Sequence, residues 1–150
     1  MQKITPFLWF DTQLEEAVTF YTSIFKDARV TYRKNGPDGK LFTASFELAG
    51  QEFMGLNGGP HYTFSPAVSF FVKCRDQTEV DYYWERLLEG GKEQQCGWLQ
   101  DRFGLCWQII PDALMRYLGD EDPAKAGRVM QAMMKMIKID VAELDRAYAG

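Results

Sequence analysis

The sequence offers few side chains for acid–base, nucleophilic or metal chemistry. His61 is the only histidine among 150 residues, and it lies in the glycine- and proline-containing segment that begins at Gly58. Histidine is the side chain whose ordinary pKa lies nearest neutrality, so His61 is a candidate general base. The sequence around it supplies no obvious orienting partner. We therefore interpret His61 as a loop residue.

The cysteines and carboxylates give no clear catalytic set either. The chain has three cysteines, Cys74, Cys96 and Cys106, and none of them forms a Cys-x-x-Cys motif. An odd number without this motif is typical of reduced thiols in a cytosolic protein. A nucleophilic cysteine needs a base or a helix N-terminus to stabilise its thiolate, and the lone histidine is distant in sequence. Carboxylates near predicted strand ends are possible bases, but solvated turn or edge positions explain them more simply: Glu47, Glu52 and Asp101. The catalytic residues stay unknown.

Aromatic residues are the most distinctive part of the composition. Phe, Tyr and Trp make up 15% of the chain, which indicates either a well-filled core or a ligand cavity with aromatic walls. The net charge of −4 argues against a nucleic-acid partner, which would require a basic face. No apolar run is long enough to cross a bilayer, so no membrane partner is expected. The first residues lack a signal-peptide layout, which predicts a cytoplasmic protein.

The elements that would position these residues follow one order twice. In the first half, residues 3–10 predict a strand, Asp11 or Thr12 a helix cap, and an apolar stripe from Leu14 to Phe25 a helix. Strands are expected at residues 28–33, 41–48 and 51–56. In the second half, residues 66–74 predict a strand, Asp76 caps a helix, and up to three strands follow at residues 93–95, 97–100 and 105–110.

We therefore predict an α+β fold made of two βαβββ modules in a single domain, residues 1–150. Module 1 spans about residues 3–58 and module 2 about residues 66–111, joined by a flexible link. Residues 112–150 form a tail of two or three short helices, with cap signals at Asp112, at Asp122 before Pro123, and at Asp140. The apolar stripe of Val129, Met130, Met133, Met134 and Ile137 predicts a helix packed on the core; a partner-subunit surface is the alternative.

A doubled βαβββ pattern resembles the vicinal oxygen chelate superfamily, which includes glyoxalase I, bleomycin-resistance proteins and extradiol dioxygenases. More closely, the sequence resembles the PhnB-like family, labelled a 3-demethylubiquinone-9 3-methyltransferase domain. The resemblance implies that the paired modules form a cupped mixed sheet. It rests on residues 4–11, 16–25, 57–60, 69–72 and 129–140, and most specifically on residues 97–111, Gly-Trp-Leu-Gln-Asp-Arg-Phe-Gly-Leu-Cys-Trp-Gln-Ile-Ile-Pro.

The resemblance also implies where a metal ion would lie. Superfamily members that use metal hold it with His, Glu or Gln from the first and last strand of each half. Aligning the strands places these positions at Thr5, Met54, Ser69 and Gln108. Only Gln108 is a ligand type of that kind, and hydroxyls with one thioether do not make a zinc or nickel site. We therefore expect no metal and no cofactor.

The leading interpretation is a metal-independent small-molecule-binding protein. Its aromatic and polar contacts would come from strand faces: Thr5, Phe7, Trp9, Met54, Ser69, Phe71, Trp98 and Gln108. The alternative is an enzyme acting on a small apolar or aromatic substrate, a lyase, isomerase or transferase. A methyltransferase of the common kind has a glycine-rich first turn, which residues 11–13 lack. A third possibility is a structural protein whose rings fill the cup.

Exposed sheet edges predict a homodimer.

Overall fold

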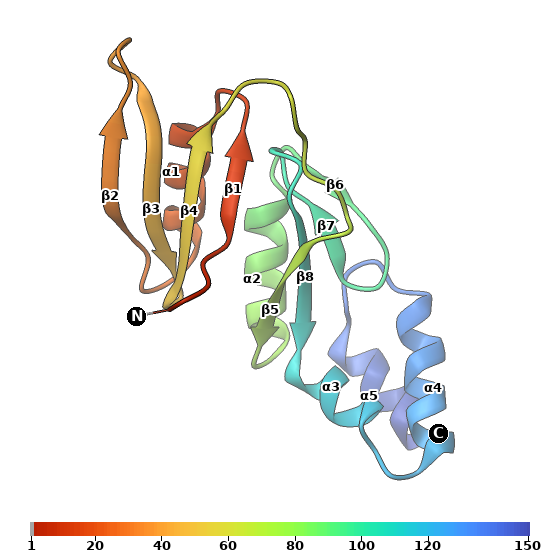
Figure 1. Cartoon of the computed structure of the whole chain (residues 1–150). Helices are drawn as coiled ribbons and strands as arrows, with labels where there is room; N and C mark the ends of the chain where they lie inside the picture. Colours follow the sequence, from red (N-terminus) through yellow and green to blue (C-terminus); the bar gives the residue numbers. More distant parts are fainter. Residues whose placement is uncertain (1) are drawn as a thin grey trace. The chain divides into compact units, whose positions relative to one another are not determined.

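The computed structural model describes residues 2–150, which form two compact units. The first unit ends at Phe64 and the second begins at Ser65. Each unit has its own four-stranded mixed sheet and one helix that crosses between the first two strands (Figure 1). Across residues 2–150, none of the helices has the length and hydropathy that crossing a bilayer requires. The α+β class and the repeated βαβββ order are thus confirmed.

The first unit contains β1 (Phe7–Phe10), α1 (Leu14–Ile24), β2 (Arg29–Asn35), β3 (Leu41–Leu48) and β4 (Gln51–Asn57). Its strand order is β1-β4-β3-β2, with β1 parallel to β4 and the other pairs antiparallel. Because alternate residues of a strand face opposite sides, one face packs on α1 and the other faces away from it. The buried side includes Leu8, Phe46 and Phe53.

The second unit contains β5 (Ser69–Cys74), α2 (Gln77–Leu88), β6 (Lys92–Glu93), β7 (Trp98–Gln100) and β8 (Cys106–Pro111). The strand order β5-β8-β7-β6 repeats the topology of the first unit, with β5 parallel to β8. Three helices follow: α3 (Asp112–Leu118), α4 (Pro123–Met134) and α5 (Val141–Ala149). Figure 1 shows α3 continuing directly from the end of β8, with α4 and α5 beside it.

The start of the chain differs from the expectation. The predicted strand over residues 3–10 is wrong in length, because β1 begins only at Phe7. Pro6 has no backbone N–H to donate, although its carbonyl oxygen still accepts a hydrogen bond from Met54 N at 2.9 Å. Thr5 therefore lies before the strand and is half-buried.

The cap of α1 comes from a residue distant in sequence. The prediction of Asp11 or Thr12 as N-cap is wrong: the helix begins after Gln13, whose side chain makes no capping hydrogen bond. Asn57, at the end of β4, instead accepts from Leu14 N through Oδ1 at 2.9 Å. The first turn of α1 is thereby fixed to the sheet.

The caps predicted at Asp76, Asp122 and Asp140 are confirmed, whereas the one predicted at Asp112 is wrong, because Asp112 is the first residue of α3 and no side chain caps that helix. The side chain of Asp76 accepts from Glu79 N at the start of α2, and that of Asp140 accepts from Glu143 N at the start of α5. Pro123 occupies the first turn of α4, where a missing N–H costs nothing.

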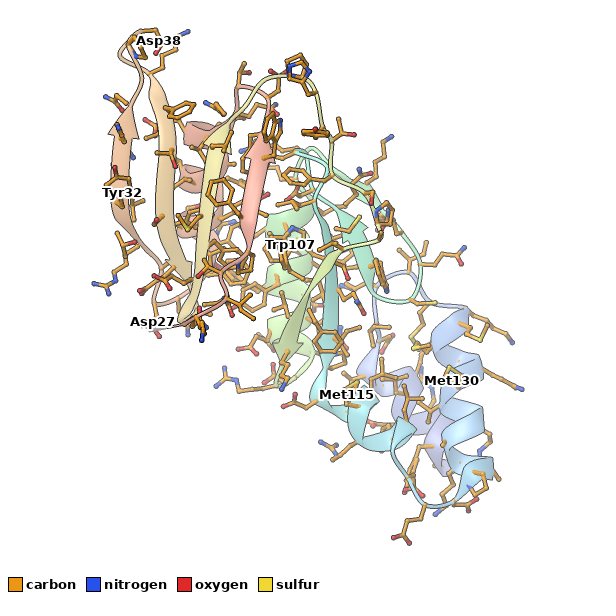
Figure 2. All side chains as sticks on the ribbon, in the orientation of Figure 1. Asp27, Tyr32, Asp38, Trp107, Met115 and Met130 are labelled. Atoms are coloured by element: carbon orange, nitrogen blue, oxygen red, sulfur yellow. The ribbon has the colours of Figure 1, made fainter. Side chains whose placement is uncertain are left out.

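The methionine-rich helix packs on a narrower face than predicted. Val129 is fully buried and Met133 is half-buried, whereas Met130 and Met134 are 41% and 61% exposed. The apolar stripe thus divides between the core and the surface. Figure 2 shows Met130 on α4 and Met115, also exposed, on α3.

Candidate ligand-binding site

Three of the predicted site residues form one row across the sheet of the second unit. Trp98 on β7 is paired with Gln108 on β8, and Gln108 is paired with Phe71 on β5. Paired residues of neighbouring strands project to the same face of a sheet. Their sequence neighbours Leu99 and Trp107 are buried, on the face that packs on α2. The row of Trp98, Gln108 and Phe71 therefore lies on the face away from α2.

The polar members of this group are joined to each other. Gln108 Nε2 donates to Ser69 Oγ at 2.9 Å, which links β8 to the first residue of β5. Both side chains are half-buried, while Phe71 is 43% exposed. The structure thus brings together all four predicted residues of the second unit, with two aromatic rings flanking one amide.

The first unit carries a corresponding row. Phe7 on β1 is paired with Met54 on β4, Met54 with Ser45 on β3, and Ser45 with Tyr32 on β2. A Cβ built on Gly55 would contact Leu14 of α1, so the neighbouring Met54 faces away from the helix.

Two members of this row were missed by the sequence analysis. The alternation in residues 41–48 places Ser45 opposite the core face, so that signal was present. Tyr32 gave no usable signal, because a register shift between Val30 and Tyr32 changes the face it occupies. Figure 2 shows Tyr32 on the edge strand β2.

Trp9 is engaged by its own chain. Its Nε1 donates to Gly59 O at 2.9 Å, and its ring lies edge-on to that of Tyr62, 5.0 Å between centroids. A Cβ on Gly58 would lie 2.3 Å from the Trp9 ring, so only glycine allows this close approach. The segment of residues 58–62 is therefore held against β1. Trp9 shares a face with Phe7 but presents less free surface.

Asp101 holds the turn that sets the register of the second row. The expectation of a solvated turn residue is wrong, because Asp101 is only 3% exposed. Its Oδ1 accepts from Phe103 N at 2.9 Å and Leu105 N at 3.0 Å, and its Oδ2 accepts from Trp107 Nε1 at 2.9 Å. These bonds fix the connection from β7 to β8. Asp101 is thus a positioning residue for Trp98 and Gln108.

The other candidate reactive groups occupy structural positions. Burial raises the pKa of the Cys74 thiol to about 12 and also raises the pKa of Cys106, so both are thiols at neutral pH. All three cysteines are free, and Cys96 is half-buried. Glu47 is paired with Arg29 at 3.1 Å on the neighbouring strand. His61 is exposed, as expected of a loop residue.

The residues at the superfamily's metal positions do not fit a divalent ion. Within residues 2–150, no group of three or more His, Cys, Asp or Glu side chains converges as a metal site would require. Gln108 and Ser69 are hydrogen-bonded to each other, and the corresponding position in β4 is the thioether of Met54. Neutral amides, hydroxyls and a thioether leave the charge of such an ion unbalanced.

The first unit also contains a cleft of about 820 Å³, which none of the residues of its row lines. It lies between the start of α1 and the β2–β3 hairpin, whose tip carries Asp38 (Figure 2). An ion pair between Arg33 and Glu15, 2.7 Å apart, lies on its wall. None of the predicted site residues lines it.

Two βαβββ units, each with one sheet face away from its helix, form the architecture that the resemblance to the vicinal oxygen chelate superfamily predicts. The model of the 3-demethylubiquinone-9 3-methyltransferase family matches residues 2–110. The PhnB protein from Bacillus cereus is 33% identical, with a TM-score of 0.69 over 73% of this chain and 99% of that chain. The chain belongs to this PhnB-like family.

More distant structures share the fold alone. Protein PA1353 from Pseudomonas aeruginosa is 18% identical, with a TM-score of 0.61 over 74% of this chain and 98% of that chain. The fosfomycin resistance protein FosX from Listeria monocytogenes, in complex with Mn(II) and sulfate, is 18% identical, with a TM-score of 0.52 over 71% and 89%. No curated protein matches the chain. The family match ends at residue 110, so the resemblance assigned to residues 129–140 lies outside it.

Proposed function

We propose that this chain is a metal-independent protein that binds a small, partly apolar molecule. The observation that carries the proposal is the row of Phe71, Gln108 and Trp98, where two aromatic rings flank one amide on an open sheet face. Small-molecule sites combine apolar walls with a few polar groups that fix orientation. The row of Phe7 and Met54 is a second, separate candidate surface in the first unit.

The exposure of these rings favours a ligand over a filled cup. Phe7 is 50% exposed and Phe71 is 43% exposed. A ligand that covers these rings removes apolar surface from water, which contributes favourably to the free energy of binding. Thr5, half-buried beside β1, and Trp9 are proposed as peripheral contacts.

Metal independence follows from the chemistry of the side chains. In the superfamily, a bound ion acts as a Lewis acid, and carboxylate or imidazole side chains are needed among its ligands. Thr5, Met54, Ser69 and Gln108 contain neither. The Mn(II) of the Listeria protein belongs to that protein and does not transfer to this donor set.

Elemental analysis tests this part of the proposal. Protein purified without a histidine tag should contain well below one equivalent of zinc, nickel, iron or manganese per chain, because neutral donors hold these ions weakly. Near one equivalent per chain, removed by a chelator together with ligand binding, would show that the metal assignment is wrong.

The family's methyltransferase description is not what the residues favour. Common methyltransferases bind their methyl donor, S-adenosylmethionine, with a glycine-rich turn and a helix N-terminus that faces the ligand. In this chain residues 11–13 contain no glycine, and the first N–H of α1 already donates to Asn57. Binding without transfer is therefore the better-supported function, and the enzyme hypothesis stays the alternative.

Replacing Trp98 by alanine should weaken binding of an aromatic probe such as phenol. Loss of ring stacking removes about 0.5–1.5 kcal/mol, beyond the loss of buried area. This corresponds to a decrease in affinity of roughly twofold to tenfold, measurable by calorimetric titration. Tyr82→Ala is the matched control, because Tyr82 is an exposed aromatic residue on α2 in the same unit and should not change affinity. Equal affinity of wild type and Trp98→Ala would contradict the proposed contact.

We also propose that the protein is a homodimer. The edge strand β2 is exposed at every position except Val30, so its unpaired backbone groups are open to pairing or cover. Exposed Met130 and Met134 add apolar surface elsewhere in the chain. Light scattering at micromolar concentration should give twice the mass of one chain. A monomer mass under those conditions would end the dimer proposal.

A further inference from the structure

The helices after β8 lie outside the part of the chain that matches the family. The family match ends at residue 110, and the Bacillus protein is covered almost completely by 73% of this chain. Residues 112–150, which we call the C-terminal extension, contain α3, α4 and α5. The contacts of this extension are therefore not part of what the family match describes.

The extension buries the position directly beyond the site row. Ile110 lies two residues after Gln108 on β8, so both face the same side of the sheet, roughly 7 Å apart. Ile110 is 4% exposed, and its buried cluster otherwise consists of residues from the extension: Leu114, Val129, Met136, Ile139 and Leu144. The open face of the second unit thus ends one position beyond Gln108.

The extension is also bonded to the residues that precede Trp98. Cys96 N donates to Met136 O and Gly97 N donates to Ile137 O, both at 2.8 Å. Gly97 has a φ of +85°, and a Cβ there would lie 2.9 Å from the side chains of Ile110 and Ile139. The backbone beside Trp98 is therefore shaped to accept this segment.

Side-chain contacts with α2 anchor the same segment. Gln77 donates to Ile139 O at 3.0 Å and accepts from Val141 N at 2.7 Å. Lys138 Nζ lies 2.7 Å from Asp81 Oδ1, and this contact lowers the pKa of Asp81. The segment is thus tied to β7, β8 and α2 together, which makes it a fixed wall.

The first unit closes the corresponding position differently. Leu56, two residues after Met54, is paired with Trp9 and is only half-buried. Trp9 is in turn covered by residues 58–62. At the corresponding position of the second unit, Ile110 is covered by the C-terminal extension, whereas in the first unit residues 58–62 provide the cover.

We propose that Met136 and the extension around it form the end wall of the ligand site in the second unit and set the length of ligand that fits. This inference rests on the proposed binding function. It assigns a specificity role to residues outside the family match. A ligand that covers Gln108 between Phe71 and Trp98 and extends along β8 toward its end would meet this wall at Ile110.

The first arm of the test compares two probes that differ by one ring, phenol and 4-phenylphenol. Met136→Ala shortens the wall, so the affinity for 4-phenylphenol relative to phenol should rise about fivefold over wild type. Met134→Ala makes the same change at an exposed position of the neighbouring helix and should leave the ratio unchanged. An unchanged ratio in Met136→Ala, with phenol still bound, would overturn the wall while the binding function stands.

The second arm uses the wild-type chain, in case Met136→Ala does not fold. In spectra of ¹³C-methyl-labelled methionine, saturation with phenol should shift the Met136 signal and leave the Met134 signal in place. Phenol binding that depends on Trp98 without a shift at Met136 would overturn the inference alone. No binding of either probe would overturn the proposed function and this inference with it.

Discussion

Replacing Asp101 by alanine is expected to lower the free energy of unfolding by about 3–5 kcal/mol. The variant leaves three donors, Phe103 N, Leu105 N and Trp107 Nε1, without their buried acceptor. Hydrogen bonds to a charged group contribute about 1.5–3 kcal/mol each, and unsatisfied buried donors add a desolvation cost. For a chain of this size the loss corresponds to a fall in Tm of roughly 10 °C, measurable by thermal unfolding.

Two further variants separate the role of Asp101 from a general effect of removing a carboxylate. Asp101→Asn keeps an acceptor oxygen for the turn but presents its NH₂ group to the N–H of Trp107, so an intermediate loss is expected. Asp38→Ala removes an exposed turn carboxylate that accepts from Lys40 N at 3.0 Å, and it should cost less than about 1 kcal/mol. A Tm of Asp101→Ala equal to that of Asp38→Ala would contradict the assigned role.

The second large effect is expected from Gly91→Ala, which should destabilise the fold by about 3 kcal/mol. A Cβ at this position would lie 2.1 Å from the carbonyl oxygen of Gln100 and 3.0 Å from the backbone of Asp101. Because Lys92 pairs with Gln100, β6 would have to move away from β7. Chemical denaturation measures the loss.

Gly127→Ala is the matched control for Gly91→Ala, because it makes the same substitution in open space. Gly127 lies in α4, and nothing approaches within 4 Å of its added Cβ. Alanine in a helix interior should stabilise the protein by about 0.5–1 kcal/mol. The two glycine variants should therefore change stability in opposite directions. A Gly91→Ala protein as stable as wild type would refute the contact.

Local sequence signals predicted most of the fold. The strand over residues 41–48 has the predicted bounds, and Asp76 and Asp140 cap their helices as expected. These features depend on neighbours a few residues apart, where alternation and capping chemistry act directly. Phe42 is an exception, because β3 has an irregularity there: Lys34 pairs with Thr43 and Asn35 with Leu41, which leaves Phe42 unpaired in the ladder and 48% exposed while Leu41 is buried.

The features that the sequence did not predict depend on residues far apart in the chain. Asn57 caps α1 across 43 positions, and the segment around Met136 bonds to Cys96 and Gly97. To predict the burial of Asp101, one would need to know that Trp107, on the next strand, donates a hydrogen bond to it. Of the candidate site, the aromatic residues and Gln108 followed from strand alternation and the family resemblance, whereas Tyr32 required the observed register.

The four tryptophans provide the most direct test of the proposed binding face. Trp84 and Trp107 are buried in the core, Trp9 donates to Gly59, and Trp98 lies on the open face beside Gln108. Each indole N–H gives one signal in a ¹⁵N–¹H spectrum, and a Trp98→Phe variant assigns the relevant one. Titration with phenol should shift the Trp98 signal saturably and leave the signals of Trp84 and Trp107 in place. A Trp98 signal that does not move at millimolar phenol would contradict the account.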